Sequence, residues 1–213
     1  MYFICINNMR KVEELKKELR KKLYSYVLEK KEITEIFQAV SYADKMHAGQ
    51  FRVGGEAYIC HPLRVAIATA EYFAKESLKE LKVAVISALL HDVVEDTEAT
   101  FEEVDALFGN YVTKIVKATS HSLNSDGLVN EDEPDEVYLL QVEQGGLIAI
   151  VIKRFDMKDN LNSLKEVPED FYISHLNDYK KKLKIWKEID IEGWAEVHVV
   201  FLKTQQDGCK KNN

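Results

Sequence analysis

Apolar residues recur at helical spacing along most of the chain, and this pattern predicts a mostly helical protein. Residues 81–96 are apolar nearly all round, which is expected of a helix at the centre of a core. The β-branched run at 147–152 would suit a strand, but helical spacing continues beyond it to Leu164. The pattern therefore predicts helices at residues 9–30, 32–47, 61–74, 81–96, 101–109, 111–123, 137–146, 147–164 and 171–189.

Two loops and the chain ends depart from this helical pattern. The segment 48–58 contains three glycines, and the acidic, turn-rich segment 124–136 is expected at the surface. Near the C-terminus, residues 195–204 alternate like a strand. They could pair with residues 2–6, so the sequence allows a small terminal β-ribbon beside the helices.

The length and composition favour a single globular domain. The 213 residues suffice for one substantial core, and 46% hydrophobic with 31% charged residues is typical of a globular protein. No internal repeat or linker interrupts the chain, so we expect one domain over residues 1–213. Its motif-bearing core covers about residues 33–190, with the N-terminal helix and the C-terminal tail as appendages.

Charge and cysteine content limit the partners and the compartment. A formal net charge of -7 argues against binding a nucleic-acid polymer but allows a small nucleotide carried with a divalent metal. No stretch approaches membrane-spanning length, and residues 2–6 are too short for the apolar region of a signal peptide. The three cysteines are far apart, so no disulfide framework is expected. We expect a cytoplasmic protein without a membrane partner; an oligomer is compatible with the sequence, which carries no signature of one.

The segment HDVVEDT, residues 91–97, places four polar side chains directly behind the apolar run AVISALL. On a helix, His91 and Glu95 share one face, and Asp92 and Asp96 share an adjacent one. Burying these groups is costly unless they are paired or bind a cation. The His-Asp doublet can present a nitrogen and a carboxylate to one cation, while the next two acids can orient or deprotonate a water molecule. The segment therefore favours a metal-dependent hydrolytic site.

A metal site needs further ligands, and His61 and Asp156 are the leading candidates. His61 begins a helix after the glycine loop, and Asp156 follows the apolar segment LIAIVIKRF, where an unpaired carboxylate would be costly. His47 lies on an apolar stripe and is expected in the core or in support of the site. The histidines without motif context are His121, His175 and His198. The cations that could hold phosphates are Lys45, Arg52 and Lys153.

Three blocks of the chain read HAGQFRVGGEAYICHPLRVA, SALLHDVVEDTEATFEEVDALFG and KRFDMKDNLNSL. In this order and spacing they resemble the HD-domain hydrolases of the RelA/SpoT family, specifically its small stand-alone alarmone hydrolases. The similarity spans roughly residues 36–165. Together the three blocks are highly specific, whereas the two ends of the chain carry no motif.

The resemblance implies an all-α, HD-domain helical bundle that binds one manganese ion, Mn²⁺. By position, the implied metal ligands are His61, His91, Asp92 and Asp156. Such a mixed set of nitrogen and oxygen donors suits manganese better than ions that prefer thiolates. The residues that match the family's catalytic acids are Glu95 and Asp96. The residues that match substrate-binding positions are Arg52, which would pack on the guanine base, Tyr58 and Asn160.

The implied reaction is hydrolysis of the 3′-pyrophosphate of guanosine tetra- or pentaphosphate, ppGpp or pppGpp, to GDP or GTP and pyrophosphate. Several positions depart from the family pattern. Val53 follows Arg52 where a second cation is common, Gly54 stands where serine is common, and Met157 and Asp159 stand where arginine and histidine are usual. Two alternatives therefore remain open: an HD-type phosphohydrolase for another nucleotide or dinucleotide phosphate, and a nucleotide-binding regulator with a decayed active site.

Overall fold

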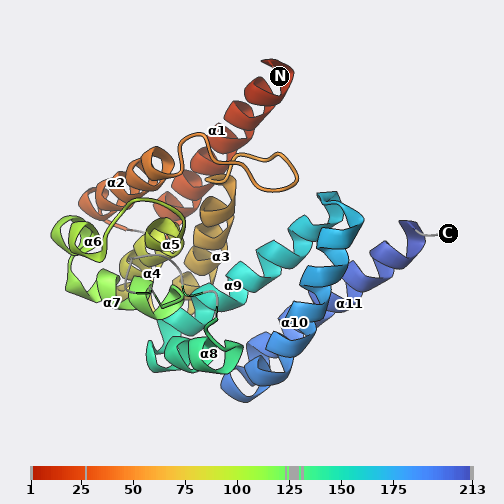
Figure 1. Ribbon diagram of the computed structural model, residues 1–213. Coiled ribbons are helices and arrows are strands. Elements are labelled where there is room, and N and C mark those ends of the chain that lie inside the picture. Colours follow the sequence, from red (N-terminus) through yellow and green to blue (C-terminus); the bar gives the residue numbers. More distant parts are fainter. Residues whose placement is uncertain (1, 27, 123, 125–129, 131, 212–213) are drawn as a thin grey trace.

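The computed structural model describes residues 2–26, 28–122, 124, 130 and 132–211, and its regular elements are helices (Figure 1). In chain order they are α1 (Tyr2–Ser25), α2 (Lys30–Met46), α3 (Cys60–Glu76), α4 (Leu78–Leu90), α5 (Val93–Asp96), α6 (Phe101–Phe108), α7 (Asn110–Thr119), α8 (Asp135–Gln144), α9 (Leu147–Ser163), the 3₁₀ helix η1 (Leu164–Glu166), α10 (Glu169–Ile189) and α11 (Ile191–Lys211). The predicted all-helical class is confirmed. Within the described residues, no helix is long and apolar enough to cross a membrane.

Helices α3, α4 and α9 contact one another and form the centre of the fold. Every residue from 84 to 90 of α4 is buried, as its all-round apolar pattern predicts. This burial requires neighbours on all sides, and α2, α3, α7 and α9 supply them. Figure 1 shows α10 and α11 on one side of this centre and α2, α6 and α7 on the other.

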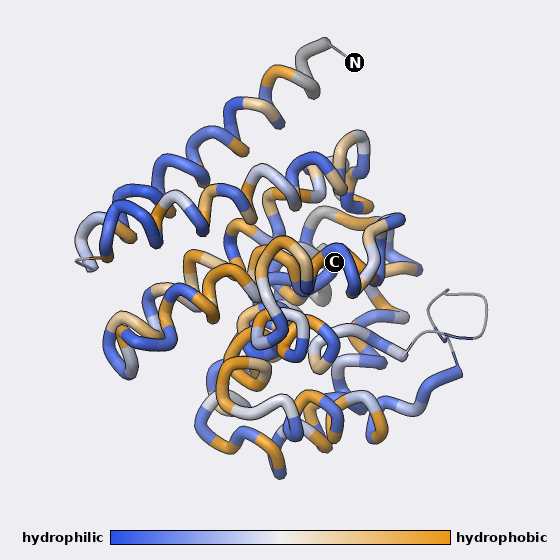
Figure 2. The backbone as a smooth tube through the Cα atoms, turned by 90° about the vertical axis from the view of Figure 1, so that its left-hand side faces the viewer, coloured by the Kyte–Doolittle hydropathy of each residue, from blue (hydrophilic) through white to orange (hydrophobic). Residues whose placement is uncertain are grey.

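The N-terminal helix α1 is amphipathic, as its pattern predicts, and it begins earlier than expected, at Tyr2. Figure 2 shows it as a mostly hydrophilic helix with interspersed apolar turns. Its buried side chains include Val12, Leu19 and Leu23, which recur at helical spacing. This stripe packs against α3.

The helix predicted at 81–96 is divided near its end. Helix α4 ends at Leu90 and α5 starts at Val93, because the backbone of Asp92 (φ -100°, ψ -5°) departs from regular helical geometry. The N–H of Asp96 still donates to the carbonyl of Asp92 at 2.9 Å. The one-turn spacing between the His-Asp doublet and the next two acids is therefore retained.

The terminal β-ribbon allowed by the sequence is wrong. Residues 2–6 begin α1, and residues 195–204 lie within α11. Val197 and Phe201 are buried at helical spacing, whereas Val199 between them is 50% exposed. The alternation of apolar residues concealed this helical stripe, which packs on α9.

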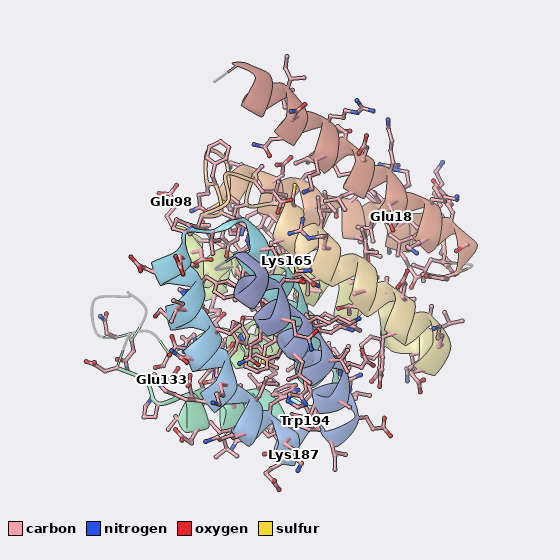
Figure 3. All side chains as sticks on the ribbon, turned by 90° about the vertical axis from the view of Figure 1, so that its right-hand side faces the viewer. Glu18, Glu98, Glu133, Lys165, Lys187 and Trp194 are labelled. Atoms are coloured by element: carbon pink, nitrogen blue, oxygen red, sulfur yellow. The ribbon has the colours of Figure 1, made fainter. Side chains whose placement is uncertain are left out.

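A buried ion pair fixes the junction of α9, α10 and α11. Arg154 Nε and Nη2 donate to the two carboxylate oxygens of Asp190, each at 2.8 Å. Asp190 also accepts the N–H of Gly193 at 3.0 Å, and a side chain at Gly193 would collide with Arg154 and Asp190. Figure 3 shows α10 and α11 side by side, with Lys187 and Trp194 near their connected ends. The junction thereby sets the position of α10, which forms one wall of the cleft described next.

Candidate active site

A cleft of about 430 Å³ opens between the loop that precedes α3 and helices α5, α9 and α10. All the predicted site residues line it except His91. His91 is buried in the core and reaches the same group of side chains from there. The structure therefore brings together residues that lie far apart in the sequence.

The four predicted metal ligands converge from α3, from the turn between α4 and α5, and from α9. His61 Nε2 lies 3.4 Å from Asp92 Oδ2 and 3.2 Å from Asp156 Oδ1. His91 Nε2 lies 3.1 Å from Asp92 Oδ1 and 3.8 Å from Asp156 Oδ1. One ligand atom from each of His61, His91 and Asp92 fits within 4.8 Å of the others. This group could hold a metal ion.

The environment of His91 fits a bound cation. Its Nδ1–H donates to the carbonyl of Ala88 at 2.9 Å, so the neutral imidazole carries its lone pair on Nε2. That buried Nε2 makes no hydrogen bond within the described residues, although Asp92 Oδ1 is close. A buried nitrogen without a partner is costly, and a metal ion is a suitable partner for a lone pair beside carboxylates.

The carboxylates also make the site electrostatically favourable for positive charge. Burial opposes protonation of His61, but hydrogen bonds to Asp156 and Asp159 outweigh it and raise the pKa of His61 to about 10. Burial likewise opposes ionisation of Asp156, yet Lys153 and His61 hold its pKa well below its usual range. A divalent cation would balance the charge of these carboxylates, and His61 could then coordinate it through Nε2 in the neutral form.

The acidic pair Glu95 and Asp96 lines the cleft beside this group. Glu95 Oε2 accepts the backbone N–H of His121 at 3.0 Å. Desolvation and the charge of Asp92 raise the pKa of Glu95 to about 7, and the same two causes raise the pKa of Asp96. A carboxyl group that titrates near neutrality can take a proton from water and release it again.

The Tyr58 hydroxyl lies between Asp92, at 2.8 Å, and Asp96. It has one proton and so donates to one of the two carboxylates at a time. Its ring stacks on His47 with the centroids 4.6 Å apart. His47 Nδ1 lies 2.8 Å from Gln50 Oε1, and Gln50 Nε2 donates to the Asp96 carbonyl at 2.7 Å. His47 therefore supports the site from behind Tyr58, as its apolar stripe suggested.

Arg52 lies at the rim of the cleft and is tied to α9. Its Nη2 donates to Asn160 Oδ1 at 2.6 Å, and Asn160 Nδ2 donates to Asp156 Oδ1 at 2.6 Å. Two predicted substrate-binding residues thus connect to a predicted metal ligand. The flanking Phe51 and Val53 are 58% and 55% exposed, so the rim faces solvent.

Two histidines without motif context also line the cleft. His121 follows α7 and His175 lies on α10, and both are outside the three motif blocks. Helix α10 further contributes Tyr179 to the wall. The third such histidine, His198, lies outside this cleft and stacks on Trp194. Sequence spacing gives no signal for these positions, because tertiary packing alone brings α10 to the site.

Of the three candidate phosphate-binding cations, two line the cleft and one does not. Arg52 and Lys153 line the cleft, whereas Lys45 is exposed and does not. Lys153 Nζ lies 2.8 Å from Asp156 Oδ2 and 4.8 Å from the centroid of the Tyr138 ring. Lys153 is therefore positioned against the metal-type residues rather than free in solvent.

Residues 39–144 match the family described as HD domain. The matched segment covers 106 of the 213 residues, so this part of the chain resembles an HD domain. The His-Asp doublet, His91 and Asp92, lies within the matched segment. The acidic pair, Glu95 and Asp96, lies there too. The match ends before α9, which carries Asp156.

This chain is similar to curated proteins over part of their length. It is 32% identical over 138 residues, 61% of this chain and 18% of the relative, to a probable guanosine-3′,5′-bis(diphosphate) 3′-pyrophosphohydrolase of Mycoplasma pneumoniae. It is 29% identical over 171 residues, 79% of this chain and 24% of the relative, to a guanosine-3′,5′-bis(diphosphate) 3′-pyrophosphohydrolase of Borreliella burgdorferi. The chain thus spans less than a quarter of the length of these relatives.

A solved structure shares the fold of this chain. It is described as a metazoan ortholog of SpoT that hydrolyses ppGpp. The TM-score is 0.63 at 23% sequence identity, and the match covers 79% of this chain and 94% of the other. The RelA/SpoT-type resemblance carried by the three sequence blocks is therefore confirmed.

Proposed function

We propose that this protein is a metal-dependent hydrolase that removes the 3′-pyrophosphate from guanosine tetra- or pentaphosphate, releasing GDP or GTP and pyrophosphate. The main observation behind the proposal is that metal-type ligands and an acidic pair lie together in one cleft. A set of nitrogen and oxygen ligands lies directly beside an acidic pair whose pKa values are raised. A binding protein needs no such acidic pair, so this arrangement favours an enzyme over a nucleotide-binding regulator.

The metal in this proposal is Mn²⁺, held by His61, His91, Asp92 and Asp156. Two imidazoles with two carboxylates suit manganese, and none of these four ligands is a thiolate. When bound, the ion lowers the pKa of water and polarises a phosphoryl oxygen. Two observations support these histidines as ligands. His91 Nε2 has no hydrogen-bond partner within the described residues, and nearby carboxylates favour positive charge at His61.

Glu95 is the proposed proton acceptor for the attacking water. Its pKa of about 7 reflects a carboxyl group that is desolvated and faces the charge of Asp92. The N–H of His121 fixes one carboxylate oxygen, which leaves the other available to the cleft. Asp96, held beside the Tyr58 hydroxyl, would orient the water. Attack at phosphorus would break the bond to the ribose 3′-oxygen, and that oxygen would leave with a proton.

Arg52, Tyr58 and Asn160 are the proposed nucleotide-binding residues, with Lys153 as a phosphate contact. The planar guanidinium of Arg52 at the rim can stack on a purine face. Within the described residues, Arg52 and Lys153 are the arginine and lysine side chains that line the cleft. A substrate with two pyrophosphate groups therefore relies on the metal for much of its charge compensation.

We further propose that residues 1–213 act as one unit on a free small-molecule nucleotide in the cytoplasm. The net charge of -7 disfavours a nucleic-acid polymer or an anionic membrane as partner. The buried, free thiol of Cys60 is compatible with a reducing compartment.

One observation favours a second candidate within the same class. Val53 supplies no charge at the rim, and Asp159 places a carboxylate near Arg52, with Arg52 Nη1 3.5 Å from Asp159 Oδ2. Both features reduce the positive charge that would meet a phosphate-rich ligand. The alternative substrate is another nucleotide or dinucleotide phosphate, cleaved by the same metal and acidic pair.

A substrate panel tests the proposal. The protein is incubated with Mn²⁺ and, separately, with guanosine tetraphosphate, guanosine pentaphosphate, GTP and dinucleotide phosphates. Released pyrophosphate and orthophosphate are measured separately. We expect pyrophosphate from the first two nucleotides. Cleavage of another member of the panel with guanosine tetraphosphate untouched would establish the alternative substrate.

A further inference from the structure

Asp159 contacts the second ring nitrogen of His61. His61 turns Nε2 toward Asp92 and Asp156, while Nδ1 lies 2.7 Å from Asp159 Oδ2. An imidazole offers one nitrogen to a cation when the other carries the proton, and a carboxylate at Nδ1 holds the proton there. Asp159 thus determines that Nε2 is the nitrogen presented to the group of ligands.

The other proposed ligand, His91, provides an internal comparison. Its Nδ1–H donates to a neutral acceptor, the carbonyl of Ala88, at 2.9 Å. Only His61 of the two donates to a carboxylate, and this charge-assisted hydrogen bond is the stronger kind. A carboxylate acceptor also makes the opposite nitrogen more basic. His61 is therefore the better electron donor of the two histidines.

Asp159 is itself held in place by Arg64. Arg64 Nε donates to Asp159 Oδ1 at 2.6 Å, and Nη2 donates to Oδ2 at 2.9 Å. Arg64 lies three residues after His61 on α3, so both side chains face α9 on the same side of the helix. The fork of the guanidinium matches the carboxylate in a way that lysine does not.

The far side of Arg64 is fixed by the loop that precedes α3. Glu56 accepts from Arg64 Nη1 and Nη2 at 2.8 Å each, and it also pairs with Lys11 of α1. The side chains of Glu56 and Asp159 are 13% and 12% exposed, so solvent screens these contacts weakly. The contacts form one line from α1 through Glu56, Arg64 and Asp159 to His61.

We propose that Asp159, held by Arg64 and Glu56, is a positioning residue that orients His61 for metal binding. The inference rests on the proposed function, because it assumes that His61 is a metal ligand. It assigns a role to three residues outside the predicted site set. It also connects the rim of the cleft to the metal group, since Arg52 and Glu56 belong to the same loop.

Metal titration of the intact protein tests the proposal. The dissociation constant for Mn²⁺ is measured by calorimetry for the wild type and for Asp159→Asn, Arg64→Lys and Asp44→Asn. We expect Asp159→Asn to weaken binding by about 10- to 100-fold, the usual effect of removing such a support. Arg64→Lys keeps the charge but loses the fork and should give a smaller loss. Asp44→Asn, whose carboxylate pairs with Lys16 outside the cleft, should bind as the wild type does.

A second measurement needs no variant and remains decisive if Asp159→Asn fails to fold. The tautomer of His61 is read from imidazole nitrogen shifts in the wild-type protein loaded with Zn²⁺, a diamagnetic probe. We expect the proton on Nδ1 and the metal on Nε2. A proton on Nε2, or an unchanged Mn²⁺ affinity in folded Asp159→Asn, would overturn the positioning role and leave the proposed function standing. Failure of the wild type to bind either metal would overturn both.

Discussion

The two sides of the cleft are built differently. The proposed metal side consists of His61, His91 and Asp156, which are all at most 4% exposed and lie on the central helices α3 and α9 or at the end of α4. The rim uses a loop whose Phe51 and Val53 are more than half exposed and which is held by hydrogen bonds. Close packing fixes the first side, with polar support that reaches His61 from Glu56 of the loop, whereas polar contacts alone fix the second.

This difference suggests that the metal side serves the chemical step and the rim serves substrate recognition. Side chains anchored in a packed core hold their positions accurately, which a metal site requires. A loop at the rim can change its residues at little cost to the fold. We therefore expect changes on the metal side to abolish turnover, and changes at the rim to alter the apparent affinity for substrate.

Removal of His91 should have the largest effect. His91→Ala deletes a proposed ligand and should reduce the metal content to background and abolish turnover. It should also remove the rise in thermal stability that metal gives the wild type, since a ligand stabilises only the state that binds it. His198→Ala is the matched control, because His198 stacks on Trp194 outside the cleft. Wild-type metal content in His91→Ala would exclude His91 from the site.

Glu95→Gln should have the next largest effect and should separate chemistry from metal binding. The amide cannot accept the proton of water, so kcat should fall by about 10²- to 10⁴-fold while Mn²⁺ affinity is retained. The pKa of Glu95 is raised to about 7 by desolvation and by Asp92, and a bound cation would lower it. The loss of kcat on the acid side should therefore lie at or below pH 7 in the wild type and disappear in the variant. A wild-type pH profile in Glu95→Gln would contradict the assignment.

Arg52→Ala should act mainly on KM. Stacking on the base serves the bound substrate and the transition state alike, so KM should rise by about 10-fold with kcat changed much less. The control is Arg10→Ala, an exposed arginine that pairs with Glu14 on α1. Steady-state kinetics on guanosine tetraphosphate distinguish the two parameters. A loss confined to kcat would place Arg52 in the chemical step and would contradict the assignment of the rim to substrate affinity.

The smallest effect is expected from Asn8→Ala. The Asn8 amide donates to the carbonyl of Gly55 and accepts from the N–H of Ala57, both at 3.1 Å, so α1 holds the rim loop. Loss of these contacts should cost about 1 kcal/mol of stability and raise KM by about 2- to 5-fold. Denaturation and kinetics measure the two changes. A large fall in kcat would mean that the loop acts on the proposed metal side through Glu56 more than on substrate affinity.

The helical class was predictable because apolar residues repeat at helical spacing through most of the chain. The region around Val197 misled the prediction, since alternation and helical spacing overlap over a few residues and only packing on α9 distinguishes them. The division of the helix at Asp92 left no trace in the apolar pattern, because both parts keep their buried residues. Local periodicity therefore indicates the type of element better than its ends.

The residues of the candidate site were expected to lie together where motif blocks contain them, and not where tertiary packing alone brings them in. His61, His91, Asp92 and Asp156 meet as their motif positions imply. The contribution of α10 depends on how that helix lies across the cleft. The supporting role proposed for Asp159 depends on its partner Arg64, which lies in the first sequence block but has no role implied by the resemblance. In the sequence Asp159 is only a departure from the family pattern, whereas in the structure it contacts His61.

The most direct test is a single-turnover assay in ¹⁸O-labelled water. Wild-type protein with Mn²⁺ should convert guanosine tetraphosphate to GDP and pyrophosphate in equal amounts, with the label in pyrophosphate. A chelator should stop the reaction, and Glu95→Gln should slow it. Release of orthophosphate, turnover without a divalent metal, or no conversion of guanosine tetraphosphate would contradict the proposal of a metal-dependent 3′-pyrophosphohydrolase.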